Sequence, residues 1–249
     1  MIIIKNDKEI DLMRIAGRIV AETLLLVEKE VRPGITTAEL DRIAAEFITK
    51  HGAKPSFKGL YGFPASLCIS VNEQVVHGIP GGYVLKEGDI ISVDCGANIN
   101  GFHGDAARTF AVGNISEEAK RLIKVTEESF FKGLEFAKVG NRLTDISHEI
   151  QRYVEVSGFS VVREFVGHGI GKSVHEDPEV PNFGRPGRGP KLVAGMALAI
   201  EPMVNMGTYR VATLGDDWTV VSADKSLSAH YENTVVILPD GPEILTLIK

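Results

Sequence analysis

The chain has 249 residues, of which 44% are hydrophobic and 24% charged, a composition typical of a globular protein large enough to bury a sizeable core. Its formal net charge of -6 provides no global attraction to a polyanion, so no direct nucleic-acid site is predicted. The sequence has no signal-peptide core and no apolar run near the roughly 18 residues of a membrane span, so we expect a soluble protein without membrane contact.

Two similar pairs of helices are predicted. Apolar residues recur every three or four positions over residues 7–29, and Asn6 is the expected N-cap. A second helix follows the cap residue Thr36. An equivalent long helix is predicted over residues 116–138, and an equivalent short one over 144–157.

The spacing of the pairs repeats. The glycines that flank each short helix are 18 residues apart in both cases, from Gly34 to Gly52 (52−34) and from Gly140 to Gly158 (158−140). This echo indicates an internal duplication, although a duplication by itself is also compatible with a purely structural scaffold. We therefore predict a single catalytic domain, 1–249, with two pseudo-symmetric halves of roughly 1–113 and 114–249.

Strand-like runs lie between and after the helices. They cover residues 66–71, 89–96, 103–112, 160–166, 196–204, 218–221 and 229–238. Hairpin turns such as "NING" predict antiparallel pairing, so the expected fold class is α+β, with an antiparallel sheet backed by the two helix pairs. Cys68 and Cys95 lie in these apolar runs, which favours reduced thiols and a cytoplasmic location.

Five polar residues stand out in strand or tight-turn context: Asp94, Asp105, His168, Glu201 and Glu232. A single strand aspartate more often ends a strand or bonds a turn than binds a metal. Burying several unpaired carboxylates, however, costs several kcal/mol each, roughly, so the set needs cations. Two divalent ions balance four acids and a neutral imidazole, and the donor types suit Mn, Fe(II), Co or Zn.

The remaining histidines give weaker signals. Taken singly, His77 and His175 are interpreted as hydrogen-bonded structural histidines. The segment "NFGRPGRGPKL" is interpreted as a solvated loop without chemistry. Four further histidines are interpreted as surface or supporting residues: His51, His103, His148 and His230.

Five stretches resemble the type I methionine aminopeptidase family in order and spacing: "VNEQVVHGIP", "SVDCGANINGFHGDAARTF", "GHGIGKSVHEDP", "AIEPM" and "SLSAHYENT". The resemblance covers essentially the whole chain. It implies the duplicated pita-bread α+β fold with pseudo-twofold symmetry. It also implies two divalent metal ions held by Asp94, Asp105, His168, Glu201 and Glu232, with Asp105 and Glu232 bridging.

The resemblance further implies the mechanism and the pocket. A metal-activated water attacks the first peptide bond; Glu201 accepts its proton, His175 stabilises the oxyanion and His77 holds the peptide beyond the cleaved bond. The implied substrate pocket comprises Phe57, Leu60, Phe63, Cys68, His77, Val174, His175 and Trp218. Departures from the usual family residues occur at Phe57 (often cysteine), Leu60 and Phe63 (often tyrosine), Val174 (sometimes phenylalanine) and Asn233 (usually histidine).

The expected function is therefore removal of the N-terminal (initiator) methionine from nascent chains with a small second residue, by a monomer acting at the ribosome. No ribosome-binding patch is legible in the sequence. One alternative is a proline-directed aminopeptidase of the same fold, against which the chain length argues because such relatives carry an added N-terminal domain. The other is an inactive binding paralogue, against which the presence of all five implied ligands argues.

Overall fold

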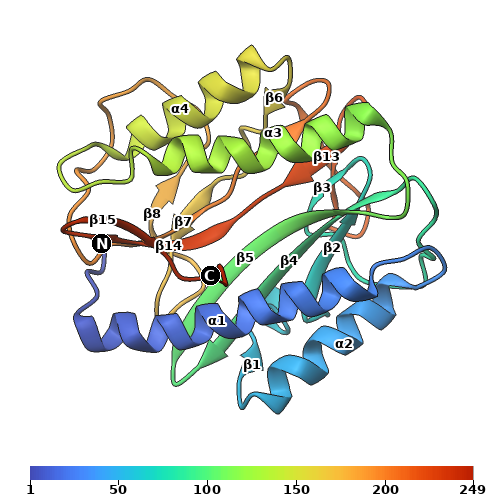
Figure 1. The fold of residues 1–249 in the computed structure, drawn as a ribbon, viewed down its shortest axis with the longest axis horizontal. Coiled ribbons are helices and arrows are strands. Elements are labelled where there is room, and N and C mark those ends of the chain that lie inside the picture. The colour runs from blue at the N-terminus through green and yellow to red at the C-terminus, as the bar shows by residue number, and fades with distance from the viewer. Residues whose placement is uncertain (249) are drawn as a thin grey trace.

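A computed structural model describes residues 1–248, in which four α-helices cover one side of antiparallel sheets (Figure 1). The helices form the two predicted pairs, with α1 and α2 near one end of the view and α3 and α4 near the other. Their bounds are α1 (Asp7–Glu30), α2 (Thr37–Lys50), α3 (Glu117–Leu134) and α4 (Leu143–Val156), and a short 3-10 helix, η1, spans Leu60–Gly62.

The helix starts follow the predicted caps. The side chain of Asn6 accepts a hydrogen bond from the Glu9 amide at 3.1 Å, and the Glu9 carboxylate accepts one from the Asn6 amide at 3.1 Å. Thr36 and Glu39 form the same reciprocal pair at the start of α2. Each capping box satisfies two amides that the helix itself leaves unpaired.

The strands are short except for one long hairpin. In chain order they are β1 (Lys54–Pro55), β2 (Leu67–Val71), β3 (Gln74–Val76), β4 (Ile90–Ile99), β5 (Phe102–Ala111), β6 (Ser160–Val161), β7 (Gly167–Gly169), β8 (Glu176–Val180), β9 (Ala197–Ile200), β10 (Met203–Asn205), β11 (Val211–Thr213), β12 (Val220–Ser222), β13 (Ser228–His230), β14 (Asn233–Leu238) and β15 (Gly241–Ile244).

All the strand pairs are antiparallel, which confirms the predicted α+β class. Strand β4 pairs along its whole length with β5, and β2 and β1 share its other edge. Later strands form a five-stranded sheet in the order β15-β14-β9-β7-β8 and a smaller sheet in the order β13-β10-β6. A third small sheet, β11-β12-β3, joins the early strand β3 to two later strands.

The prediction of one strand over residues 196–204 is wrong. β9 ends at Ile200 and β10 begins at Met203, so Glu201 lies in a break between them. Pro202 follows directly, and proline cannot donate the amide hydrogen bond that a continuous ladder needs.

The predicted strand over residues 229–238 is also interrupted. β13 ends at His230 and β14 begins at Asn233, with Glu232 in the break. There the Glu232 amide donates to the Ala107 carbonyl of β5 at 3.0 Å instead of continuing its own ladder. Three further bounds differ: the strand predicted over 160–166 is limited to β6, the one over 218–221 starts at β12, and the helix predicted to residue 138 ends with α3 at Leu134.

Equivalent local contacts occur in both parts of the chain. Isolated bridges join Thr36 to Val84 and Arg142 to Lys191, and the two bridges are offset by 106 residues (142−36) and 107 residues (191−84). The four glycines that flank the short helices all have positive φ, from 74° to 98°. These equivalences support the duplication, and the division into two halves stays a prediction.

The helices cover one face of the sheets and leave the other for chemistry. The apolar face of α1 packs on β4 and β5, with Val20, Leu24 and Val27 buried against that sheet. Successive strand side chains point to opposite faces, so in β4 the Cys95 thiol contacts Thr23 of α1 while the neighbouring Asp94 points the other way.

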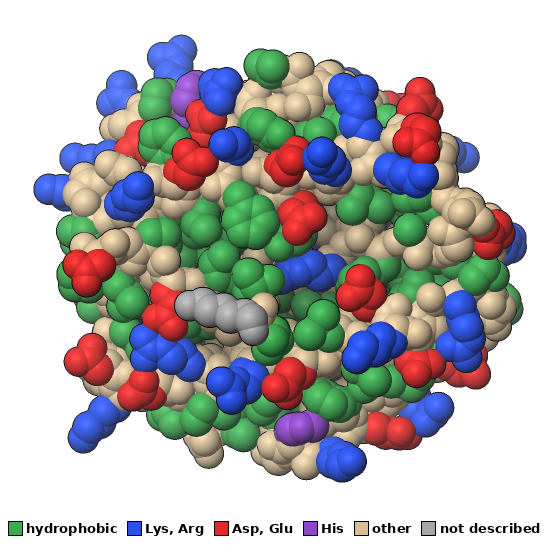
Figure 2. Space-filling model, in the orientation of Figure 1, with side chains coloured by type: hydrophobic (Ala, Val, Ile, Leu, Met, Phe, Trp, Pro, Cys, Tyr) green, Lys and Arg blue, Asp and Glu red, His purple; other side chains and the backbone are tan. Residues whose placement is uncertain are grey.

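The helix-covered surface carries mixed charge. Positive and negative side chains of the described residues alternate over this face (Figure 2), an arrangement that gives little net attraction for a polyanion. No helix within residues 1–248 combines the length and apolarity that a membrane crossing requires.

Gly17 marks the closest approach of α1 to its neighbours. A Cβ added there would lie 2.4 Å from the Leu245 carbonyl oxygen, and one added at Gly104 of β5 would lie 2.8 Å from the Gly17 nitrogen. Helix propensity alone predicts that Gly17→Ala stabilises by about 1 kcal/mol. Because a backbone atom blocks the space, we expect it instead to lower the free energy of unfolding by about 1–3 kcal/mol in urea titrations.

Gly215→Ala is the matched control, because no atom lies within 4 Å of a Cβ at that position. We expect it to change the free energy of unfolding by less than about 0.5 kcal/mol. A Gly17→Ala protein as stable as the wild type would contradict this account of the helix–sheet contact.

Candidate metal centre

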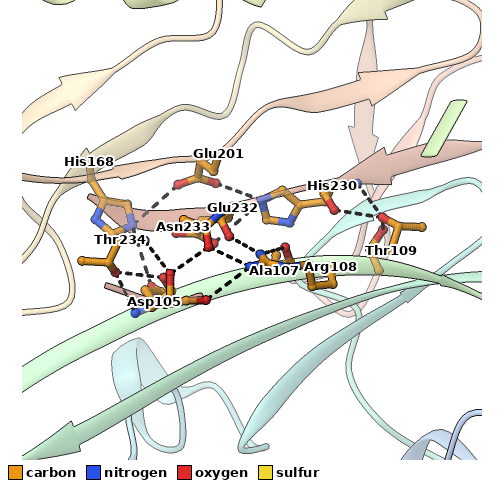
Figure 3. Close-up of polar contacts among 12 residues, drawn as sticks. Asp105, Ala107, Arg108, Thr109, His168, Glu201, His230, Glu232, Asn233 and Thr234 are labelled. Atoms are coloured by element: carbon orange, nitrogen blue, oxygen red, sulfur yellow. Dashed lines mark hydrogen bonds and ion pairs between the residues drawn. The ribbon is translucent and has the colours of Figure 1, made fainter. Parts of the chain in front are cut away.

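Strand β5 contacts the break between β13 and β14. Backbone hydrogen bonds join Ala107 and Glu232 in both directions, at 3.0 and 3.3 Å. Two strand positions away, the Asp105 amide donates to Thr234 Oγ1 at 3.0 Å, and that hydroxyl donates to the Asp105 carbonyl at 2.9 Å (Figure 3). These contacts place the side chains of Asp105 and Glu232 side by side.

The five predicted polar residues all line one cavity of about 570 Å³ on the face away from the helices: Asp94, Asp105, His168, Glu201 and Glu232. They come from five different places in the chain. Asp94 is in β4, Asp105 in β5 and His168 in β7, while the two glutamates occupy the strand breaks described above. The register pairs Asp94 with Cys68, so both side chains emerge on the cavity face.

The ring of His168 faces the acids through Nε2. Its Nδ1 lies 2.9 Å from the Gly169 carbonyl oxygen, to which it donates, and this bond assigns the free lone pair to Nε2. Nε2 lies 3.6 Å from Glu201 Oε1 and 4.0 Å from Asp105 Oδ2. Donor atoms of Asp105, His168 and Glu232 all lie within 4.8 Å of one another, as ligands of a shared ion do.

Sequence reasoning did not assign His230 to this cluster. Its side chain is 2% exposed, and Nε2 lies 3.5 Å from Glu201 Oε2 and 3.9 Å from Glu232 Oε2. Of the two interpretations that the sequence left open for His230, the surface position is therefore wrong and the supporting position agrees with the structure. The sequence did contain a signal for this placement. His230 lies two residues before Glu232 in an apolar run, and residues two apart in a strand point to the same face.

The buried carboxylates lack partners. Asp94 Oδ1, Asp105 Oδ1 and Glu232 Oε1 are buried with no hydrogen bond within the described residues. Burial raises the pKa of Asp94 to about 7, and it raises the pKa values of Asp105, Glu201 and Glu232 well above their ordinary range. Without cations, these carboxyl groups cannot all be ionised at the same time. Together with the unprotonated imidazole nitrogen, their oxygens form a donor set that fits divalent cations.

Two further histidines flank the cluster. His77 has a φ of 60°, and its ring meets the rings of Phe165 and Trp218 edge-on, with centroids 5.5 and 6.5 Å away. The ring of His175 stacks on Tyr61 at 5.8 Å and lies 4.5 Å from the ring of His168. Burial lowers the pKa of His77 to about 4 and also lowers that of His175, so both rings are neutral N–H donors at pH 7.

One end of the cavity is apolar. Phe57, Phe63 and Cys68 are buried there, and the rings of Phe63 and Trp218 meet edge-on at 5.1 Å. Glycine at position 96 allows the Phe57 ring to pack closely against β4, because a Cβ at that position would lie 2.8 Å from Phe57 Cε1. Leu60 also lines the cavity, whereas Val174 is 3% exposed and packs within the same apolar cluster.

Sequence reasoning missed several other lining residues: Tyr61, Val76, Glu164, Phe165, Val166, Gly167, Glu176, Asp177, Glu179 and Met203. The most constrained of them is Glu176, next to His175. Lys5 Nζ lies 2.6 Å from Glu176 Oε2, and these side chains are only 3% and 5% exposed. The other oxygen, Oε1, accepts from the Lys172 amide at 2.8 Å, so this ion pair ties the N-terminal segment to the loop that carries His175.

The whole chain is similar to known proteins. A model of metallopeptidase family M24 matches residues 11–239. The methionine aminopeptidase of Clostridium perfringens is 78% identical over 249 residues, and methionine aminopeptidase 1 of Bacillus subtilis is 58% identical over 248 residues, with 100% of each chain covered in both cases. The crystal structure of methionine aminopeptidase from Thermotoga maritima has a TM-score of 0.98 at 48% identity and covers 100% of both chains.

The raised carboxyl pKa values predict a pH dependence of the chelator-treated protein. The pKa of Asp94 is about 7 in the folded state and 3.8 when the chain is unfolded. Protonation of Asp94 therefore stabilises the folded state fully below about pH 4, and this stabilisation is lost as the pH rises through 7. Above pH 6.5, the ordinary pKa of histidine, His77, His168 and His230 are neutral in the folded state and more than half neutral in the unfolded state, so they oppose this trend less than the four raised carboxyl groups drive it. We therefore expect the Tm in EDTA to fall between pH 6.5 and about pH 8.5.

Asp94→Asn should reduce that slope, because its side chain carries no titrating proton. Adding Mn²⁺ should raise Tm most at the higher pH, because the ion binds deprotonated carboxylates. A Tm in EDTA that stays constant across this pH range would contradict the assignment of raised carboxyl pKa values.

Proposed function

Because the chain belongs to metallopeptidase family M24, among its methionine aminopeptidases, we propose that it removes the N-terminal (initiator) methionine from peptides whose second residue is small. The observation that carries this proposal is the cavity itself, which joins a buried cluster of acids and imidazole to an apolar pocket. The chain is a hydrolase, and its metallopeptidase family together with the buried donor cluster indicates that it binds divalent metal.

We propose that two divalent metal ions would be held by Asp94, Asp105, His168, Glu201 and Glu232. Four carboxylates and one neutral imidazole balance two divalent charges, and the donor set suits Mn, Fe(II), Co or Zn. When bound, such ions supply an activated, hydroxide-like water near neutral pH and polarise the scissile carbonyl. The unpaired buried oxygens at Asp94, Asp105 and Glu232 support this assignment.

The placement of three residues supports the proposed catalytic roles. Glu201 would accept the proton of the attacking water, because its carboxylate lies within 4.8 Å of donor atoms of His230 and Glu232 and burial raises its pKa. His175 donates an N–H to the developing oxyanion, and its ring stands directly beside that of His168. His77, on the Phe165 and Trp218 side of the cavity, holds the peptide beyond the cleaved bond.

The substrate pocket explains the expected selectivity. A thioether chain suits walls of Phe57, Phe63, Cys68 and Trp218, which are apolar or polarisable. The substrate amine is drawn toward the carboxylates, which restricts cleavage to the first residue. We propose nascent polypeptides in the cytoplasm, at the ribosome, as the natural substrates, and a monomer as the acting form.

A small peptide panel tests this function. Chelator-treated protein should release methionine from Met-Ala-Ser only after Mn²⁺ or Co²⁺ is added, and turnover of Leu-Ala-Ser and Met-Lys-Ser should be at least about tenfold slower because of pocket size. Free amino acids would be quantified by chromatography. Preferred cleavage of Ala-Pro-Ser would favour a proline-directed peptidase, and no cleavage with any metal would favour a binding protein.

His175→Ala should lower kcat by about 10²–10³-fold with a smaller change in KM, because a hydrogen bond to the oxyanion forms mainly in the transition state. Steady-state kinetics with Met-Ala-Ser measure both constants. His51→Ala is the control, since His51 is exposed at the end of α2 and away from the cavity. An unchanged kcat in His175→Ala would remove this residue from the mechanism.

A further inference from the structure

His230 is the buried polar residue beside the acid cluster that has no role in the mechanism above. Its Nε2 atom is buried and forms no hydrogen bond with any described residue. The nearest acceptors are Glu201 Oε2 at 3.5 Å and Glu232 Oε2 at 3.9 Å (Figure 3). A buried ring nitrogen left without a partner is costly, so its position among carboxylates needs an explanation.

The carboxylate of Glu201 lies between two histidines. Oε1 is 3.6 Å from His168 Nε2, and Oε2 is 3.5 Å from His230 Nε2. The two rings differ in environment. His168 lines the main cavity, whereas His230 lines a second cavity of about 290 Å³, bordered by Leu24 of α1 and Ile123 of α3. His230 therefore stands behind Glu201, on its helix side.

The two rings also differ in which nitrogen carries the proton. The Gly169 carbonyl accepts from Nδ1 of His168, which leaves Nε2 of that ring with a lone pair for a metal. Within residues 1–248 no such bond fixes the ring of His230, so its Nε2 can carry the proton toward Glu201. Small side-chain rotations bring an N–H and a carboxylate to the ordinary hydrogen-bond distance of about 2.9 Å.

The backbone of His230 is held firmly. In β13 it pairs with Met203 of β10, while its amide donates to Thr109 Oγ1 at 2.9 Å and its carbonyl accepts from the same hydroxyl at 2.9 Å. Thr109 lies on β5, so three strands fix where the ring enters the site. A ring anchored in this way can restrain the side chain of Glu201.

We propose that His230 is a positioning residue of the metal centre: its Nε2–H donates a hydrogen bond to the outer oxygen of Glu201 and keeps the inner oxygen facing His168. This inference rests on the proposed function, because it assumes that Glu201 takes part in metal binding. Loss of such a supporting bond to a metal-binding side chain typically weakens metal affinity about 10–100-fold.

Two substitutions separate the hydrogen bond from packing. His230→Leu fills similar space without a donor, whereas His230→Gln keeps an N–H donor of similar reach. Mn²⁺ affinity would be measured by calorimetry, and imidazole nitrogens bound to Mn²⁺ would be detected by pulsed EPR. Near-UV circular dichroism and thermal unfolding in EDTA establish that each variant folds.

We expect His230→Leu to bind Mn²⁺ about 10–100-fold more weakly, His230→Gln to bind it nearly as the wild type does, and both to keep the wild-type imidazole signal. His168→Gln should lose that signal, and His51→Gln should change neither measurement. In kinetics with Met-Ala-Ser, His230→Leu should lower kcat more than it changes KM, because a rotated Glu201 is misplaced for proton transfer.

Three outcomes would overturn the inference. Loss of an imidazole signal in either His230 variant would make His230 a metal ligand. If His230→Leu bound Mn²⁺ as tightly as the wild type, or if His230→Gln lost as much Mn²⁺ affinity as His230→Leu, the role of His230 would be limited to packing. A wild-type protein that binds no divalent ion would refute the proposed function itself, and the inference with it.

Discussion

The close burial of four carboxyl groups dominates the chemistry of this protein. Asp94, Asp105, Glu201 and Glu232 lie in one cavity, and three of them keep an oxygen with no hydrogen-bond partner among residues 1–248. Burial out of water raises every one of these pKa values, and repulsion from neighbouring carboxylates raises those of Asp94, Asp105 and Glu232 further. Divalent ions relieve the repulsion, so metal binding and the stability of the folded site are linked.

Holding the carboxyl groups together depends on contacts between distant parts of the chain. Ala107 and Glu232 exchange backbone hydrogen bonds although they are 125 residues apart (232−107), and Thr234 bonds the backbone of Asp105. The helices cover the opposite face of the sheets (Figure 1), which leaves the cavity face open to substrate. Hydrogen bonds between these strands therefore supply the geometry of the site.

The two ends of the cavity differ in chemistry, because one is acidic and the other is apolar. In the proposed function, the acid end attracts the substrate amine and supports peptide hydrolysis, while the apolar end around Phe57 and Trp218 selects the side chain of the first residue. His77 and His175 stand between the ends as neutral donors, because burial lowers both pKa values. The buried Lys5–Glu176 pair braces the loop that carries His175 from the far N-terminus.

By itself the sequence determined the helix pairs with their capping boxes, the antiparallel α+β class and the five residues of the acid cluster. Those signals are local: a cap involves residues three apart, and a polar residue in an apolar run is conspicuous wherever it lies. Only the tertiary structure decided that the strands break at Glu201 and Glu232, that His230 faces the acids, and that Lys5 reaches Glu176. These features depend on hydrogen bonds and packing between segments far apart in the chain, which local periodicity does not encode.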